Sequence, residues 1–163
     1  MGIIWLFPGI LLAAWVQVTA LGGFGLLGAR PNLVLVGILA AALVRGPVGA
    51  LMLSTFAATL MAAVSAAPGP LWFLAYLPAG LAAAIPEGAL NRQNPVVVVF
   101  LALGTALLFD LVFFVGLSAA GWRLDVEPPL GARLLLDGIF NGLLIIPAVW
   151  LVRRLAAPTP AYR

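Results

Sequence analysis

The stretch GARLLLDGIFNGLLIIPAVWLVRR, residues 131–154, decides the fold class of this chain. A helix needs about 20 predominantly apolar residues to cross a bilayer, and this stretch is long enough. It carries Asp137 and Asn141 in otherwise apolar sequence and ends on Arg153 and Arg154. Polar side chains at membrane depth usually face protein or water, and a spacing of four residues puts these two on one helix face. We therefore expect a transmembrane helix that packs a polar stripe against neighbouring helices.

The composition of the whole chain agrees with this interpretation. The chain has 163 residues, of which 64% are hydrophobic and only 8% are charged, whereas a soluble domain has about 25% charged residues. The apolar runs are continuous, without the alternation of apolar and polar residues that marks a transmembrane β-barrel. The composition therefore predicts an all-α integral membrane protein.

Turns rich in glycine, proline or polar residues divide the apolar sequence into six expected transmembrane helices within a single domain, residues 1–163. The expected helices cover approximately residues 3–21, 31–44, 48–66, 71–90, 95–119 and 131–152. The second is short for a full span, so it would cross only among neighbouring helices or where the bilayer thins.

Arginine placement predicts the orientation, because cytoplasmic loops carry an excess of basic residues. With six helices and a cytoplasmic N-terminus, the inner segments hold Arg45, Arg92, Arg153, Arg154 and Arg163, and the outer segments hold Arg30, Arg123 and Arg133. This excess favours both termini in the cytoplasm. The arginines are scattered along the chain, which does not favour nucleic-acid binding.

The residue inventory argues against an enzyme. The chain has no cysteine and no histidine, which excludes disulfides, thiol chemistry, histidine-based acid–base catalysis and histidine metal ligation. The acids are too sparse for a metal site built of carboxylates. We therefore expect no catalytic residue, no cofactor and no metal.

Polar residues in the last two expected helices form a candidate site. Asp110 lies near the middle of residues 95–119, at a depth between Asn141 and Asp137 in an antiparallel hairpin, and Arg133 can pair with Asp137 four residues on. Such a cluster could hold helices together, recognise a polar group of a partner, or serve transport or proton relay. The candidate polar sites for structure or partner contact are Asp110, Asp137, Asn141, Arg30 and Arg45.

A stripe of small residues recurs every fourth position along the third expected helix. Its members are Gly46, Ala50, Ser54, Ala58, Ala62 and Ala66. Small residues at this spacing let another helix backbone approach closely. The stripe could pack within the protein or form a docking face for a partner helix.

Several motifs together resemble the rod-shape-determining protein MreD family. They are Arg30-Pro31-Asn32 before an apolar run, Arg45-Gly46-Pro47-Val48-Gly49-Ala50, Leu74-Ala75-Tyr76 with Gly80, Asp110, and Phe140-Asn141-Gly142-Leu143-Leu144 with Pro147 and Arg153-Arg154. The similarity covers most of the chain, although each motif is weak alone. Family members often carry an aspartate in the third helix, where this chain has neutral residues near Met61.

This resemblance implies a non-enzymatic subunit of the bacterial rod complex, or elongasome, in the inner membrane. It would bind the single-pass periplasmic scaffold MreC and thereby support RodA, penicillin-binding protein 2 and, indirectly, MreB filaments in peptidoglycan synthesis and cell-shape maintenance. The family's fold is similar to the substrate-binding S components of energy-coupling-factor (ECF) vitamin transporters.

That likeness supplies the alternative function, an S component. Such a subunit needs a solute pocket that opens outward and is lined by aromatic and polar groups. It usually shows Ala-xxx-Ala in its first helix, where this chain has Ala13, Ala14 and Gln17 without such a pair.

Overall fold

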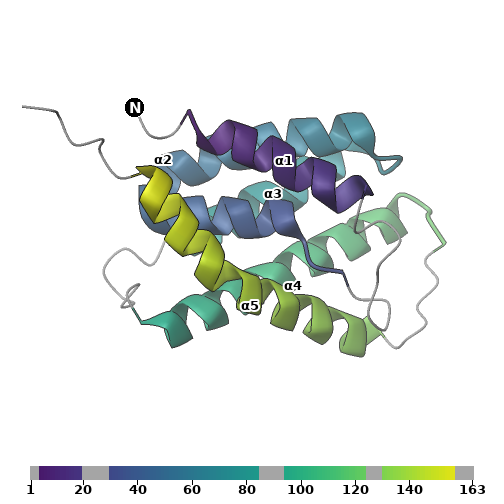
Figure 1. The fold of residues 1–163 in the computed structure, drawn as a ribbon. Helices are drawn as coiled ribbons and strands as arrows, with labels where there is room; N and C mark the ends of the chain where they lie inside the picture. Colours follow the sequence, from purple (N-terminus) through teal and green to yellow (C-terminus); the bar gives the residue numbers. More distant parts are fainter. Residues whose placement is uncertain (1–3, 20–29, 85–93, 124–129, 157–163) are drawn as a thin grey trace, which may run out of the picture.

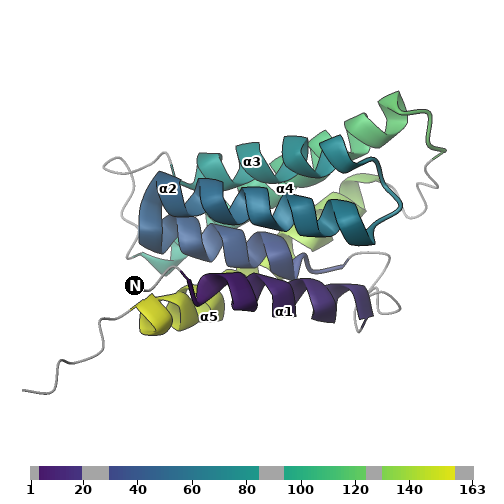
Figure 2. The same cartoon turned by 90° about the horizontal axis from the view of Figure 1, so that it is seen from above.

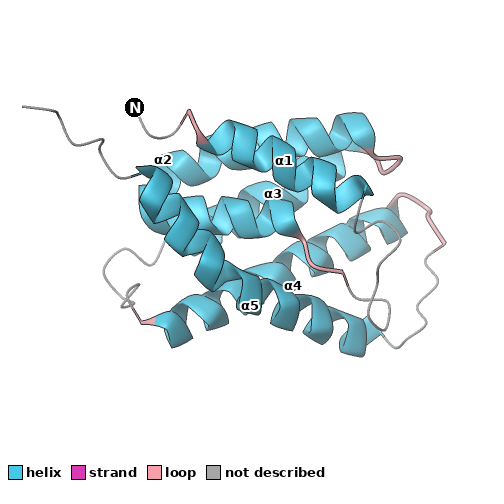
Figure 3. Cartoon of the chain, in the orientation of Figure 1, coloured by secondary structure: helices cyan, strands magenta, loops and turns pink. Residues whose placement is uncertain are grey.

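The computed structural model describes residues 4–19, 30–84, 94–123 and 130–156, and the elements in these ranges are all helices (Figures 1 and 3). They are α1 (Leu6–Thr19), α2 (Leu33–Val64), α3 (Gly69–Ala84), α4 (Pro95–Ala119) and α5 (Leu130–Ala156). The prediction of an all-α protein is thereby confirmed for the described residues. The expected continuation of the fourth helix through residues 85–90 lies outside them.

The helix α2 consists of two arms joined at Gly46. This glycine has φ 70° and ψ −162°, which is not helical, and Pro47 follows it. Proline lacks an N–H and has a fixed φ, so it suits the first turn of the second arm. The arms, residues 33–45 and 47–64, run side by side in opposite directions (Figure 2). The expected helices 31–44 and 48–66 correspond to these arms.

Three described helices are long and apolar enough to cross a membrane. They are α2, α4 and residues 131–155 of α5, while α1 and α3 are shorter apolar helices. The longest of the three, α2, reaches its length only because its two arms are counted together across Gly46. Long apolar helices of this kind indicate a membrane-embedded protein; the plan of six spans stays a prediction.

The two arms of α2 form the centre of the bundle. They pack against α1, α3 and α5, and α3 and α5 each also pack against α4. Alanines make this centre tight, since Ala40, Ala41, Ala50 and Ala57 are all fully buried. Small side chains let helices approach closely, which is the main source of packing energy where no hydrophobic effect acts between helices.

The bundle has two ends, which we call the hinge end and the Arg30 end. The hinge end contains the turn between the two arms of α2, the start of α1 and the end of α5 (Figures 1 and 2). The Arg30 end contains the end of α1, the start of α2 and the start of α5. Both ends of the described chain therefore lie on one side of the bundle.

Candidate functional site

Polar side chains of other helices hold the start of α2. The backbone N–H of Arg30 donates to Asp137 Oδ1, and the N–H of Asn32 donates to Asn141 Oδ1 at 2.9 Å. The N–H of Val34 donates to the Gln17 side chain of α1 at 3.1 Å. The isolated polar residues of α5 and α1 thus meet at one place in the fold.

The physical reason lies in the helix terminus. The first N–H groups of a helix have no partner within it, and lipid offers no water to replace one. Asn32 caps α2 by accepting from the Leu35 N–H at 3.0 Å, and the Tyr76 hydroxyl of α3 donates to the same Asn32 Oδ1 at 3.4 Å. The Asp137 carboxylate is also favoured there by the helix dipole.

This arrangement removes the two α5 polar residues from the lipid-facing surface. Asn141 is 1% exposed and Asp137 is 8% exposed. Arg133 Nε lies 3.9 Å from Asp137 Oδ2, so the pair predicted from their spacing of four residues is present. Asp137 and Asn141 thus each accept a hydrogen bond from a backbone N–H group at the start of α2.

Asp110 differs from these two residues. It is partly buried in α4, and its Oδ2 is enclosed without a hydrogen-bond partner among the described residues. It lines a cavity of about 330 Å³ at the Arg30 end, which we call the polar cavity. The polar cavity is lined by Gln17, Val18, Arg30, Pro31, Asn32, Met61, Trp72, Phe109, Asp110, Phe113, Arg133 and Asp137. The structure therefore brings Arg30, Asp110 and Asp137 together.

An aromatic cluster from α3 and α4 forms one wall of the polar cavity. The ring centroids of Trp72 and Phe113 are 4.5 Å apart, and those of Tyr76 and Phe109 are 4.7 Å apart. Phe109 and Phe113 stack with their centroids 5.7 Å apart. Trp72 is 8% exposed, and its Nε1 has no hydrogen-bond acceptor in the part of the chain that the structure describes.

Sequence reasoning missed Gln17, Asn32, Trp72 and Tyr76 as members of this site. Two of them carried a usable signal: Gln17 is the strongly polar residue of an apolar helix, and Asn32 stands at an N-cap position. Trp72 and Tyr76 have the appearance of ordinary membrane aromatics in the sequence. The place of Trp72 in the cavity lining depends on how α3 packs against α4, and Tyr76 bonds to Asn32 beside the cavity.

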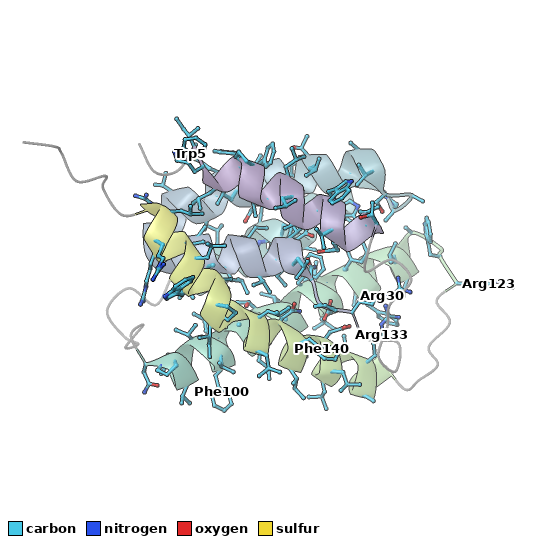
Figure 4. The ribbon with its side chains drawn as sticks, in the orientation of Figure 1. Trp5, Arg30, Phe100, Arg123, Arg133 and Phe140 are labelled. Atoms are coloured by element: carbon cyan, nitrogen blue, oxygen red, sulfur yellow. The ribbon has the colours of Figure 1, made fainter. Side chains whose placement is uncertain are left out.

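Arg45 lies apart from this site, next to the turn at Gly46. A Cβ atom added at Gly49 would come within 2.6 Å of Arg45 Cβ, so the glycine leaves room for the arginine stem. Arg45 therefore belongs to the hinge end, whereas Arg30 belongs to the polar cavity. Figure 4 shows Arg30 and Arg133 at the same end of the bundle.

The small-residue stripe lies mostly inside the protein. Gly46, Ala50, Ser54 and Ala58 are buried, Ala62 is partly buried and Ala66 is exposed. A Cβ at Gly80 of α3 would collide with Ser54 Oγ, which shows how closely α3 covers the stripe. The four buried residues are not accessible to an outside helix, and α3 packs closely over Ala50 and Ser54.

A second cavity, of about 350 Å³, lies between α1 and α5 over the first arm of α2. We call it the apolar groove. Its lining residues are Trp5, Leu6, Gly9, Ile10, Leu12, Ala13, Val16, Leu33, Val36, Gly37, Leu53, Leu144, Ala148, Leu151, Val152 and Leu155. Small residues border it on both sides, with Gly9 and Ala13 on α1 and Ala148 on α5.

Comparisons with known proteins identify no relative of this chain. No family model matches the sequence, and searches of curated proteins and of solved structures return no significant match. Within the described ranges, no group of three or more histidine, cysteine, aspartate or glutamate side chains is placed to hold a metal ion.

Proposed function

We propose that this chain is a non-enzymatic membrane adaptor that holds the single transmembrane helix of MreC in the rod complex of the bacterial inner membrane. Through MreC it supports RodA and penicillin-binding protein 2 during lateral peptidoglycan synthesis. The proposal takes its partner from the sequence resemblance to the MreD family. The observation that carries it is the apolar groove between α1 and α5.

The groove has the properties that a partner helix requires. Lipid tails are as apolar as leucine, so helices associate in a bilayer through close packing rather than through the hydrophobic effect. Gly9 and Ala13 are spaced four residues apart on α1, and no heavy atom lies within 4 Å of a Cβ added at Gly9. Because α1 packs on α2 while α5 packs on α2 and α4, the space between α1 and α5 stays open.

The test is a bulky substitution in the groove with a matched control outside it. Gly9 and Gly104 are both exposed helical glycines with nothing within 4 Å of an added Cβ, but Gly104 lies on α4, away from the groove. We expect Gly9→Leu to reduce the recovery of MreC from detergent-solubilised membranes at least fivefold, and Gly104→Leu to leave it unchanged. Equal recovery with both variants contradicts the assignment of the groove.

The proposed orientation places both termini in the cytoplasm, in keeping with the arginine distribution. The hinge end then faces the cytoplasm, and the Arg30 end with its polar cavity faces the periplasm. This side suits a partner whose soluble part lies in the periplasm.

The polar cavity supports a second candidate function, the S component of an ECF vitamin transporter. It has the aromatic and polar lining that such a subunit needs for its solute. Binding of a vitamin at nanomolar strength, together with co-purification of a transporter ATPase module, would establish this alternative. Neighbouring genes for MreB and MreC, or for vitamin metabolism, separate the two functions as well.

A further inference from the structure

We propose that the polar cavity binds a short zwitterion, with a primary ammonium at Asp110 and an anionic group at Arg30 and Arg133. The inference concerns the purified chain alone and does not depend on the adaptor function. A lipid headgroup such as ethanolamine phosphate has this chemistry, and so does a free amino acid. Both carry an anionic group joined to a primary ammonium by a short linker.

The charges that line the cavity favour a zwitterion over a simple ion. Asp137 already has partners within the protein. Its Oδ1 accepts a hydrogen bond from the Arg30 N–H, and its Oδ2 lies 3.9 Å from Arg133 Nε. Asp110 Oδ2 has no hydrogen-bond partner among the described residues, and Arg30 is exposed, with its charge near enough to Asp137 to act on it electrostatically. An anion alone would leave Asp110 without a cationic partner, and a cation alone would leave Arg30 without an anionic ligand.

Two buried polar atoms of the residues that line the cavity have no hydrogen-bond partner. Asp110 Oδ2 lacks a donor and Trp72 Nε1 lacks an acceptor within the described residues, although both atoms are enclosed. A buried polar group without a partner costs free energy, which a ligand that supplies the partner recovers. Asp110 is only partly buried, so a primary ammonium in the cavity can donate to its carboxyl group.

The size and the aromatic wall set further limits on the ligand. A volume of about 330 Å³ is near the lower end of small-molecule sites, so it suits a headgroup or a small solute. Aromatic faces attract cations, and Trp72, Phe109 and Phe113 stand beside Asp110 in the lining. The wall therefore favours the ammonium on the Asp110 side of the cavity.

The test measures ligand binding to the purified full-length protein in detergent by calorimetry. The probes are O-phosphoethanolamine and L-alanine as zwitterions, and ethanolamine and inorganic phosphate as single charges. We expect at least one zwitterion to bind at least tenfold more tightly than either single charge. Asp110→Asn and Arg30→Gln should each weaken this binding at least tenfold. Arg123→Gln is the control, because Arg123 lies outside the cavity lining (Figure 4).

A second arm identifies the source of the ligand. The protein is placed in nanodiscs that contain equal amounts of phosphatidylethanolamine and phosphatidylcholine, and the lipid retained after delipidation is identified by mass spectrometry. Retention of phosphatidylethanolamine that is lost in Asp110→Asn assigns the site to a headgroup, even if the soluble probes bind weakly. The proposal is overturned if neither zwitterion binds and neither lipid is retained selectively, or if Asp110→Asn binds as wild type does.

Discussion

Asn141 Oδ1 accepts a hydrogen bond from the backbone N–H of Asn32 at 2.9 Å, between residues 109 positions apart in the chain. This bond links the last helix to the start of α2. The amide of Asn141 is therefore a substitute for water at a partly buried helix terminus, where an unpaired N–H is costly. An apolar residue at position 141 could not accept this hydrogen bond from the Asn32 N–H.

The first prediction concerns this bond. Asn141→Leu removes the acceptor and leaves the partly buried Asn32 N–H without this partner, so we expect the free energy of unfolding to fall by about 1–3 kcal/mol. Asn141→Asp keeps an acceptor oxygen, so it should lose less stability than Asn141→Leu. Thermal and denaturant unfolding in detergent measure the effect, and Leu143→Ala, at a residue that is 64% exposed, provides a control that should change little. Equal stability of Asn141→Leu and wild type would contradict the role of the bond.

The second prediction concerns the contact between α3 and the second arm of α2. A Cβ at Gly80 would overlap Ser54 Oγ and come within 3.0 Å of Ile38 Cγ2. Gly80→Ala should therefore destabilise the protein by about 1–3 kcal/mol, as overpacking does. Because Ser54→Ala removes the overlapping oxygen, the double variant should be more stable than Gly80→Ala alone.

This pair forms a double-mutant cycle, and its interaction energy should be stabilising. Ser54 Oγ has no hydrogen-bond partner among the described residues, so Ser54→Ala alone should cost little. Gly104→Ala is the control for the change in helix propensity, since open space surrounds its Cβ. Strictly additive effects of the two substitutions would exclude the predicted collision.

The third prediction concerns the turn within α2. Gly46 has φ 70° and ψ −162°, a backbone region that is essentially restricted to glycine. Gly46→Ala should therefore cost about 1–3 kcal/mol, measured as the free energy of unfolding in detergent. Gly131→Ala, with nothing within 4 Å of its Cβ and no positive φ, should be tolerated. A tolerated Gly46→Ala would mean that the two arms can be joined by another backbone path.

The fourth prediction concerns orientation. Because the chain contains no cysteine, single cysteines can be introduced without removing any. A cysteine appended after Arg163 should resist a membrane-impermeant maleimide in intact cells, and Trp122→Cys, at a residue that is 45% exposed, should react. Both should react after the cells are permeabilised. The opposite labelling pattern would reverse the proposed topology.

The sequence predicted the helical class and the turn at Arg45-Gly46-Pro47 because both depend on local signals. Long apolar runs specify membrane helices, and a glycine next to a proline specifies a break. Asp137 and Asn141 were recognised as polar residues that avoid lipid, since their cost at membrane depth follows from residue type alone.

What those residues bond to was not predictable from the sequence, because the partners are backbone N–H groups at the start of α2. Such partners carry no side-chain signature. The small-residue stripe illustrates the same limit: its spacing shows that a helix approaches closely, while burial of Ala50, Ser54 and Ala58 depends on where α3 packs. The polar cavity likewise arises from the packing of four helices around the start of α2.

The bonds from Asp137 and Asn141 to the start of α2 also bear on biosynthesis. The ribosome makes residues 30–34 long before it makes α5, so α2 must enter the membrane with N–H groups whose partners do not yet exist. We infer that a chain lacking α5 exposes these groups and is recognised by membrane proteases. In a pulse-chase experiment, a chain ending at residue 129 should decay several times faster than the full chain. Equal half-lives would show that α5 is not needed to protect the N–H groups at the start of α2.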